Sequence, residues 1–185
     1  MQIYKIGNSI KFQGIVKSFL LFPETDTSNE SNVLVDPFNK VKETSTKIIN
    51  MAGEYEVDDV TVQLFKLEGK YSKAVNYAFT SLDNINSLWL SDEVLSLTKE
   101  EIENLPQIHL LLLSLSSDPK KLEKQVEIVS EIEPNYITYV SEDKVLIKEF
   151  EKQYGEAAEL NKKLKFKAED FEGLEESTTH FIKFD

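Results

Sequence analysis

The sequence predicts a single α/β domain in which two β-sheets are packed together with helices outside them. The first half of the chain carries short apolar runs typical of strands, and the second half alternates such runs with amphipathic helices. The chain has 185 residues, 41% of them hydrophobic, with only six glycines and five prolines. This length and composition are those of one folded domain that can bury a core.

Apolar runs that predict strands in the first half lie at residues 3–12, 16–22, 33–35, 57–67, 75–79 and 88–90. The first two runs are separated at Gly14, which favours a hairpin. Polar turn-forming residues 24–32 indicate a surface loop, and Asp36-Pro37 ends the next strand. Within residues 57–67, apolar side chains alternate with polar ones, as in a half-buried strand.

The second half predicts helices between strands. Thr98 and Glu101 fit a capping box that opens a short helix ending near Pro106. Residues 108–115 are almost continuously apolar, as expected for a strand covered on both faces. Asp118-Pro119 opens a second helix, on which residues 122, 126, 129 and 132 share one apolar face.

The remaining elements continue this alternation. Residues 136–140 predict a strand, and Ile147, Phe150 and Tyr154 mark a third helical face that ends at Gly155. Residues 181–184 predict a last strand.

Composition excludes several classes of function. With 33 acidic and 21 basic residues, the formal charge is −12, so we expect no nucleic-acid or membrane-surface partner. There is no cysteine, which excludes disulfides, thiolate metal ligands and cysteine nucleophiles. The two histidines, His109 and His180, exclude a site that needs three imidazoles from one chain.

The first residues contain no apolar leader segment, and no apolar run approaches the ~20 residues of a membrane span. We therefore expect a cytoplasmic protein.

Several short segments resemble, in the same order, those of a known family. Gly53-Glu54-Tyr55-Glu56-Val57, followed by residues 60–62, resembles its "GEYEV…GV.V" segment. Further matching pieces are residues 6–9 ("LGHS"), 33–38 ("DPF"), 90–101 ("HLGD…LTEEQ"), 110–115 with 132–134 ("DVLLIPVGG…IEP") and 164–170 ("KLKLKKSDL"). The chain thus resembles the metallo-β-lactamase-fold hydrolases, and among them the small bacterial Zn-dependent hydrolases.

This resemblance implies one metallo-β-lactamase-like domain over residues 1–185. The implied fold is an αβ/βα sandwich of two mixed β-sheets with helices on the outer faces and a metal site at the edge of the sheets. The family's signature H-x-H-x-D-H lies between "DPF" and "GEYEV". Here the 15 residues from Asn39 to Gly53 contain neither His nor Asp, so the segment is shortened and the signature is missing.

Other metal ligands implied by the family are also replaced. The opening His is Asn8, and a later His would fall near Ser141. Only Asp92, at the position of the carboxylate that bridges the metals, is retained as a vestigial ligand. Because zinc is held by several imidazoles and carboxylates, we expect no metal, no cofactor and no catalytic residues of the zinc type.

Three interpretations of the carboxylates stay open. Asp92 is either a remnant ligand or a cap of the turn before the Thr98 helix, and we favour the cap. A hard ion such as Mg²⁺ or Ca²⁺ could bind Asp92 together with Asp36 or Glu54. Glu54 and Glu56 share one strand face, where they are either an acid/base pair or solvated, and solvation is the commoner case.

Other candidate residues are expected to be structural. Trp89 and Phe38 should pack in the core, and His109 should be a hydrogen-bonded residue at a strand end. Ser9 and Ser141 could act as nucleophiles only beside a base. The sequence has no G-x-S-x-G elbow and no glycine-rich phosphate loop to support either chemistry.

The function predicted is that of a non-catalytic, metal-free homologue with a binding, assembly or regulatory role. One alternative is a hydrolase that uses carboxylates or a hard metal ion around Asp92. Another is a subunit that is completed by a partner chain, or that pairs with itself because the missing segment leaves a sheet edge open.

Overall fold

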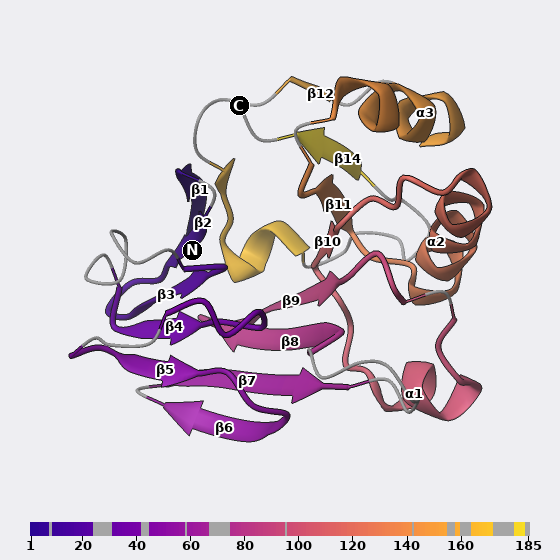
Figure 1. Ribbon diagram of the computed structural model, residues 1–185. Coiled ribbons are helices and arrows are strands. Elements are labelled where there is room, and N and C mark those ends of the chain that lie inside the picture. Colours follow the sequence, from indigo (N-terminus) through magenta and orange to yellow (C-terminus); the bar gives the residue numbers. More distant parts are fainter. Residues whose placement is uncertain are drawn as a thin grey trace.

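Two β-sheets pack face to face in the computed structural model, and helices lie outside them (Figure 1). The structure describes residues 1–7, 9–23, 31–41, 45–57, 59–66, 75–94, 96–141, 143–154, 158–159, 164–171 and 180–183.

The six-stranded sheet has the order β13-β1-β2-β3-β4-β5. Its strands are β1 (Gln2–Ile6), β2 (Ser9–Gln13), β3 (Ser18–Leu21), β4 (Val33–Val35), β5 (Lys47–Ile49) and β13 (Leu164–Lys165). The β3, β4 and β5 strands are parallel, and the others pair antiparallel. The β13 strand joins a late segment of the chain to β1, and the Met1 ammonium donates to the Phe166 carbonyl at 2.6 Å.

The eight-stranded sheet has the order β12-β14-β11-β10-β9-β8-β7-β6. Its strands are β6 (Gly53–Val57), β7 (Val60–Phe65), β8 (Tyr77–Leu82), β9 (Ile85–Leu90), β10 (Leu110–Leu113), β11 (Tyr136–Tyr139), β12 (Ala158–Glu159) and β14 (His180–Lys183). Strands β6 to β9 form an antiparallel meander, and β9, β10, β11 and β14 are parallel.

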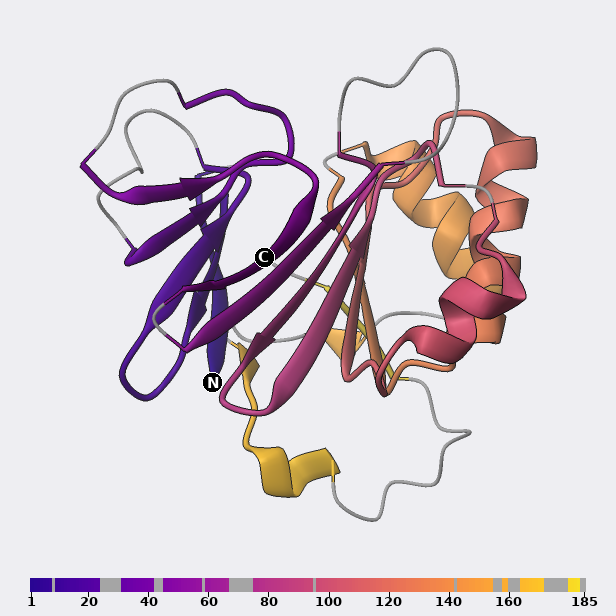
Figure 2. The same cartoon turned by 90° about the horizontal axis from the view of Figure 1, so that it is seen from below.

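Helices α1 (Lys99–Asn104), α2 (Pro119–Ile132) and α3 (Lys144–Tyr154) lie on the outer face of the eight-stranded sheet (Figure 2). A short 3₁₀ helix, Ala168–Phe171, lies at one end of the sandwich. The predicted sandwich of two mixed sheets with outer helices is confirmed. Within the described ranges, however, all three α-helices cover the same sheet.

Burial on both faces of the eight-stranded sheet explains its apolar strands. One core fills the space between the sheets and includes Phe12, Phe19 and Trp89. A second core lies between the sheet and the helices and includes Leu111, Leu113 and Phe150. Strand β10 contributes to both, and all four of its residues are buried, as the continuous apolar run predicts.

The apolar pattern missed two turns between strands. Residues 3–12 are divided at Gly7, whose φ of +59° is a conformation that glycine adopts without strain. Residues 57–67 are likewise preceded by a separate strand, β6, which turns into β7 at Asp59 with φ +63°. Glycine, Asn and Asp at such positions permit tight hairpins, which the apolar pattern alone did not reveal. The short strand β5 was not predicted.

Helix starts agree with the predictions. Thr98 and Glu101 form the complete capping box, with Glu101 N donating to Thr98 Oγ1 at 3.2 Å. Asp118 caps α2 by accepting from Lys120 N at 2.9 Å. The predicted end of the third helix at Gly155 lies outside the described residues.

In the part of the chain that the structure describes, no helix has both the length and the apolar character needed to cross a membrane. The expected location in the cytoplasm stays a prediction.

Candidate functional site

The carboxyl ends of parallel strands from both sheets meet at one end of the sandwich. Phe22 follows β3, Phe38 follows β4, and Trp89 lies at the end of β9. The ring centroids of Phe22 and Trp89 are 5.1 Å apart, and those of Phe38 and Trp89 are 5.6 Å apart. Phe22 also stacks on Phe38 at 5.6 Å. We call these three residues the aromatic plug.

Trp89 anchors the plug, because its side chain is only 1% exposed. Its indole Nε1 donates to the Ser114 hydroxyl at 2.9 Å, which satisfies the one polar atom of the ring. The core position predicted for Trp89 is confirmed. Phe38, which was also expected to point inward, covers the outside of the plug and is 45% exposed.

Phe22 is held in an uncommon backbone conformation, with φ +58°. This region is unfavourable for a bulky residue, so other contacts must hold it there. Phe22 N donates to the Val35 carbonyl, and Ser9 Oγ donates to the Phe22 carbonyl at 2.9 Å. The Ser9 hydroxyl therefore supports the backbone beneath the plug.

Asp36 is fully buried directly after β4. Its Oδ2 accepts from Val41 N at 2.8 Å, and its backbone N donates to the Ile49 carbonyl. Its Oδ1 is buried and has no hydrogen-bond partner among the residues that the structure describes. Such a group is unusual, because burial of an unsatisfied polar atom is unfavourable.

Asp92 lies in the exposed turn after β9. In the described part of this turn, Ser91 supplies the capping contacts. Its hydroxyl accepts from Glu93 N at 3.4 Å and its carbonyl accepts from Val94 N. The capping role favoured for Asp92 stays a prediction, because Leu95 of the same turn lies outside the described residues.

Glu54 and Glu56 lie on the exposed face of the edge strand β6, whereas Tyr55 and Val57 face the inter-sheet core. Alternation along the strand thus points both carboxylates away from the space between the sheets. The Gln63 side chain donates to Glu54 Oε1 at 3.1 Å. Of the two interpretations of Glu54 and Glu56, the structure shows the solvated one, because both side chains are exposed.

A short connection stands where the family signature is expected. Strand β5 of one sheet is joined to β6 of the other by residues 50–52 alone. Asn50 Nδ2 donates to Asn39 Oδ1 at 2.9 Å, and Tyr55 donates to the Met51 carbonyl at 3.0 Å. These bonds fix the crossover, which lies within residues 39–53, the segment where the resemblance places the H-x-H-x-D-H signature. Asn8 lies outside the described residues.

The histidines lie at the opposite ends of the strands. His109 precedes β10, and its Nδ1 accepts from Asn86 N at 2.9 Å, so the hydrogen bond predicted for it is confirmed. Burial lowers the pKa of His109 below its ordinary value. His180 begins β14. Ser141, near the expected position of a later ligand, accepts from Asp143 N at 3.2 Å.

The donor groups at the plug do not match a zinc site. Zinc takes several imidazole, thiolate or carboxylate ligands at about 2 Å. Among the residues that the structure describes, no three His, Asp or Glu side chains come together to hold one metal ion. The groups described here are aromatic rings, hydroxyls, amides and the single buried carboxylate of Asp36.

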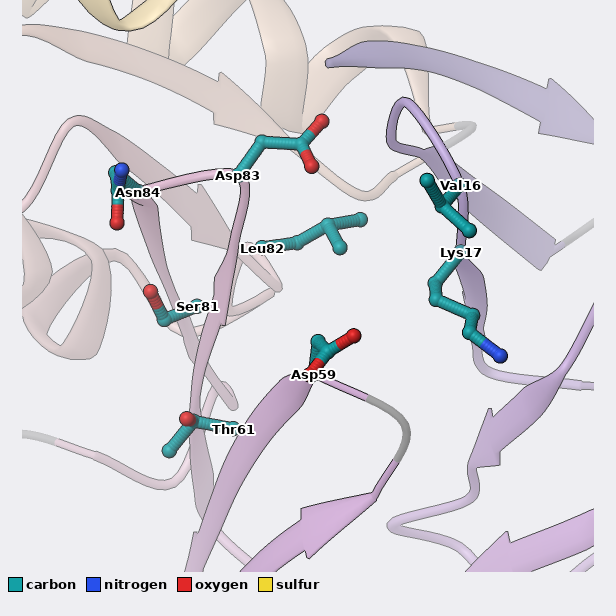
Figure 3. Close-up of a pocket in the computed structure, with 8 residues that line it drawn as sticks. All are labelled: Val16, Lys17, Asp59, Thr61, Ser81, Leu82, Asp83 and Asn84. Atoms are coloured by element: carbon teal, nitrogen blue, oxygen red, sulfur yellow. The ribbon is translucent and has the colours of Figure 1, made fainter.

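A polar hollow of about 340 Å³ lies at the amino end of β9, where three turns meet (Figure 3). Asp59 and Asp83 point toward the segment that carries Val16 and Lys17. Asp83 accepts from Ile15 N at 2.9 Å and lies 3.7 Å from the Met1 ammonium. Its contacts fix the turns against one another.

A second cavity, of about 330 Å³, lies on the outer face of the eight-stranded sheet. Its floor is the stacked pair Phe65 and Tyr77, and helix α1 with Glu101 forms one side. No pattern in the sequence indicated this cavity. In the sequence, Glu101 is recognisable only as part of a capping box. The period-two pattern indicates only that Tyr77 lies in a strand.

The order of the strands and the convergence of their ends define the metallo-β-lactamase fold. The structure superposes with a TM-score of 0.72 on a Thermotoga maritima protein of the metallo-β-lactamase superfamily that is named a Zn-dependent hydrolase. The two are 17% identical, and the alignment covers 99% of each chain.

Two further structures share the fold. The metallo-β-lactamase fold protein YhfI from Bacillus subtilis has a TM-score of 0.56 at 9% identity, over 82% of this chain and 92% of that one. CmlA β-hydroxylase has a TM-score of 0.58 at 10% identity, over 90% of this chain and 53% of its own. Comparisons with protein-family models and with curated protein sequences find no match.

Proposed function

We propose that this chain is a non-catalytic protein that uses the metallo-β-lactamase fold as a frame for binding. The observation that carries this proposal is the aromatic plug. Phe22, Phe38 and Trp89 pack together at strand ends of both sheets, and the resemblance implies a metal site at such an edge. Hydrolysis by that route needs a metal-bound hydroxide in an open, polar site.

The crossover between the sheets gives independent support. Residues 39–53 stand where the resemblance places the segment with most of the family's ligands, and within them β5 passes to β6 through residues 50–52, with Asn50 hydrogen-bonded to Asn39. A structure that had only lost single ligands would keep the longer segment. Here the supporting backbone is absent as well, so the change extends beyond a few substitutions.

We favour binding over self-pairing through a sheet edge. Edge strand β6 exposes two like charges, Glu54 and Glu56, which would face each other or their neighbours in an edge-to-edge dimer. Charged residues on edge strands prevent such pairing. Light scattering over a wide concentration range should therefore show a monomer. A dimer that persists on dilution would favour the assembly role instead.

The alternative of a hard-metal hydrolase has one observation in its favour, the unpartnered Asp36 Oδ1. A thermal-shift screen with Mg²⁺, Mn²⁺ and Ca²⁺ tests it, because an ion that binds only the native state raises the melting temperature. A shift that Asp92→Ala abolishes would favour this alternative. An unchanged melting temperature with every ion would reject it.

Metal analysis of protein purified without chelator tests the main proposal. We expect less than about one-tenth equivalent of zinc, because the donor set for tetrahedral coordination is lacking. The T. maritima homologue, purified in parallel, serves as the comparison. Zinc near one equivalent in this chain would overturn the proposal.

A further inference from the structure

The cavity beneath α1 brings an aromatic floor and one carboxylate together. Phe65 and Tyr77 are directly paired across β7 and β8, and their rings stack with centroids 4.5 Å apart. Leu97, Leu105 and Pro106 supply further apolar lining. A concave apolar site with a few convergent polar groups is the usual form of a small-molecule site, and about 330 Å³ suits a ligand of one ring.

Glu101 places a negative charge beside this floor. Its Oε1 accepts from the Tyr77 hydroxyl at 3.0 Å, and its Oε2 accepts from Thr98 N at 2.6 Å. A carboxylate offers about four acceptor positions, so each oxygen can take a further donor. The hydrogen bond from the Thr98 backbone is the main cause that lowers the Glu101 pKa, which keeps the group ionised.

Tyr77 completes the polar side of the cavity. Burial, together with its hydrogen bond to Glu101, raises the pKa of Tyr77 well above its ordinary value. The phenol therefore stays protonated and keeps Glu101 oriented. The positive charge of Lys99 on the same helix is paired with Glu103 at 3.4 Å, so it does not neutralise Glu101.

We propose that this cavity binds a small planar ring that carries a positive charge, such as an aromatic amidinium or amine. The ring would lie against the aromatic floor, and its N–H groups would donate to Glu101. The net charge of −12 disfavours an anionic ligand. The inference goes beyond the proposed function and is independent of the chemistry at the aromatic plug, which lies on the other face of the sheet.

Three probes of the same shape test the proposal on the unmodified chain: benzamidine, benzamide and benzoate. Calorimetric titration should give saturable binding of one benzamidine. We expect it to be at least about tenfold tighter than benzamide, the gain of a charge-assisted hydrogen bond over a neutral one. Benzoate should bind more weakly than either.

Two matched variants test whether the negative charge of Glu101 binds the cationic probe. Glu101→Gln keeps an acceptor for the capping box and removes the charge. It should weaken benzamidine binding about tenfold and leave benzamide within about twofold. Glu100→Gln alters an exposed neighbour in the first turn of α1 and should leave both affinities unchanged.

Equal affinities for the three probes would overturn the inference, as would absence of benzamidine binding. So would equal benzamidine affinities in the Glu101→Gln and Glu100→Gln variants. None of these outcomes bears on zinc content, so failure here is distinguishable from failure of the proposed function.

Discussion

The aromatic plug and the cavity beneath α1 lie on opposite faces of the eight-stranded sheet and contain different chemistry. Trp89 points inward to a closed aromatic cluster, whereas its β9 neighbours Leu88 and Leu90 face the helices. Tyr77, at the start of the adjacent β8, also faces the helices and lines an open cavity. Polar groups at the plug are used to hold backbone in place, while Glu101 retains acceptor positions for a ligand.

This difference shows that one face of the sheet is closed by packing while the other face has a cavity. The strand ends that carry Phe22 and Trp89 are part of the inter-sheet core. Glu101 lies at the side of the cavity, whose floor is the stacked pair Phe65 and Tyr77.

Substitution of the plug should have the largest effect. Trp89→Ala should lower the free energy of unfolding by about 3–5 kcal/mol, because it leaves a large cavity in a close-packed core. Phe38→Ala, at a half-exposed position, should lower it by less than half as much. Urea denaturation checks both. A Trp89→Ala loss no greater than that of Phe38→Ala would mean that the plug is not a packed core.

Asp36 tests whether polar groups at the plug are structural. Asp36→Ala leaves Val41 N buried without an acceptor and should lower the unfolding free energy by about 1–3 kcal/mol. Asp36→Asn keeps an acceptor and should change it by less than about 1 kcal/mol. Asp92→Asn, in the exposed turn, should stay within about 0.5 kcal/mol. If the Asp92 and Asp36 variants were equally destabilised, the turn would share the structural role of Asp36.

The third prediction concerns the N-terminal cap of α1, the helix beside the cavity. Thr98→Ala removes the N-cap acceptor and should lower the unfolding free energy by about 1 kcal/mol. It should leave benzamidine binding within about twofold, because the Thr98 backbone N–H and the Tyr77 hydroxyl still donate to Glu101. Thr98→Ser keeps the cap and is the matched control. A large loss of benzamidine affinity in Thr98→Ala alone would mean that the Thr98 hydroxyl, and not only its backbone, orients Glu101.

The smallest expected effect concerns His109, which directly precedes β10 and lines neither site. Burial favours its neutral form, so its pKa is lowered in the folded state relative to the unfolded state. Below about pH 6.5, the unfolded chain takes up the proton first, and stability is lost as pH falls. His109→Gln should reduce the loss of stability measured by urea between pH 7.5 and pH 5.5. An identical loss in both proteins would contradict this contribution.

Signals from neighbouring residues in the sequence predicted several elements of the fold correctly. The capping box at Thr98, the cap at Asp118 and the continuous apolar run of β10 each occur where predicted, because they depend on neighbouring residues. The turns at Gly7 and Asp59 were missed, since their positive φ angles interrupt patterns that look continuous.

The sites depend on contacts between distant residues and were harder to predict. Phe22, Phe38 and Trp89 come from three separate strands, and only the pairing of both sheets brings their rings together. Tyr77 and Glu101 are 24 residues apart, and no local pattern indicates that one accepts a hydrogen bond from the other. The loss of the metal signature was visible in the sequence, but what fills its place was not.

Trp89 is the only tryptophan of the chain, so its fluorescence reports directly on the plug. The most direct test of the central claim is therefore a zinc titration followed by Trp89 emission. We expect blue-shifted emission, typical of a buried indole, that does not change up to several equivalents of zinc. A saturable change that is complete at one or two equivalents would show a metal bound beside the plug and would contradict the account.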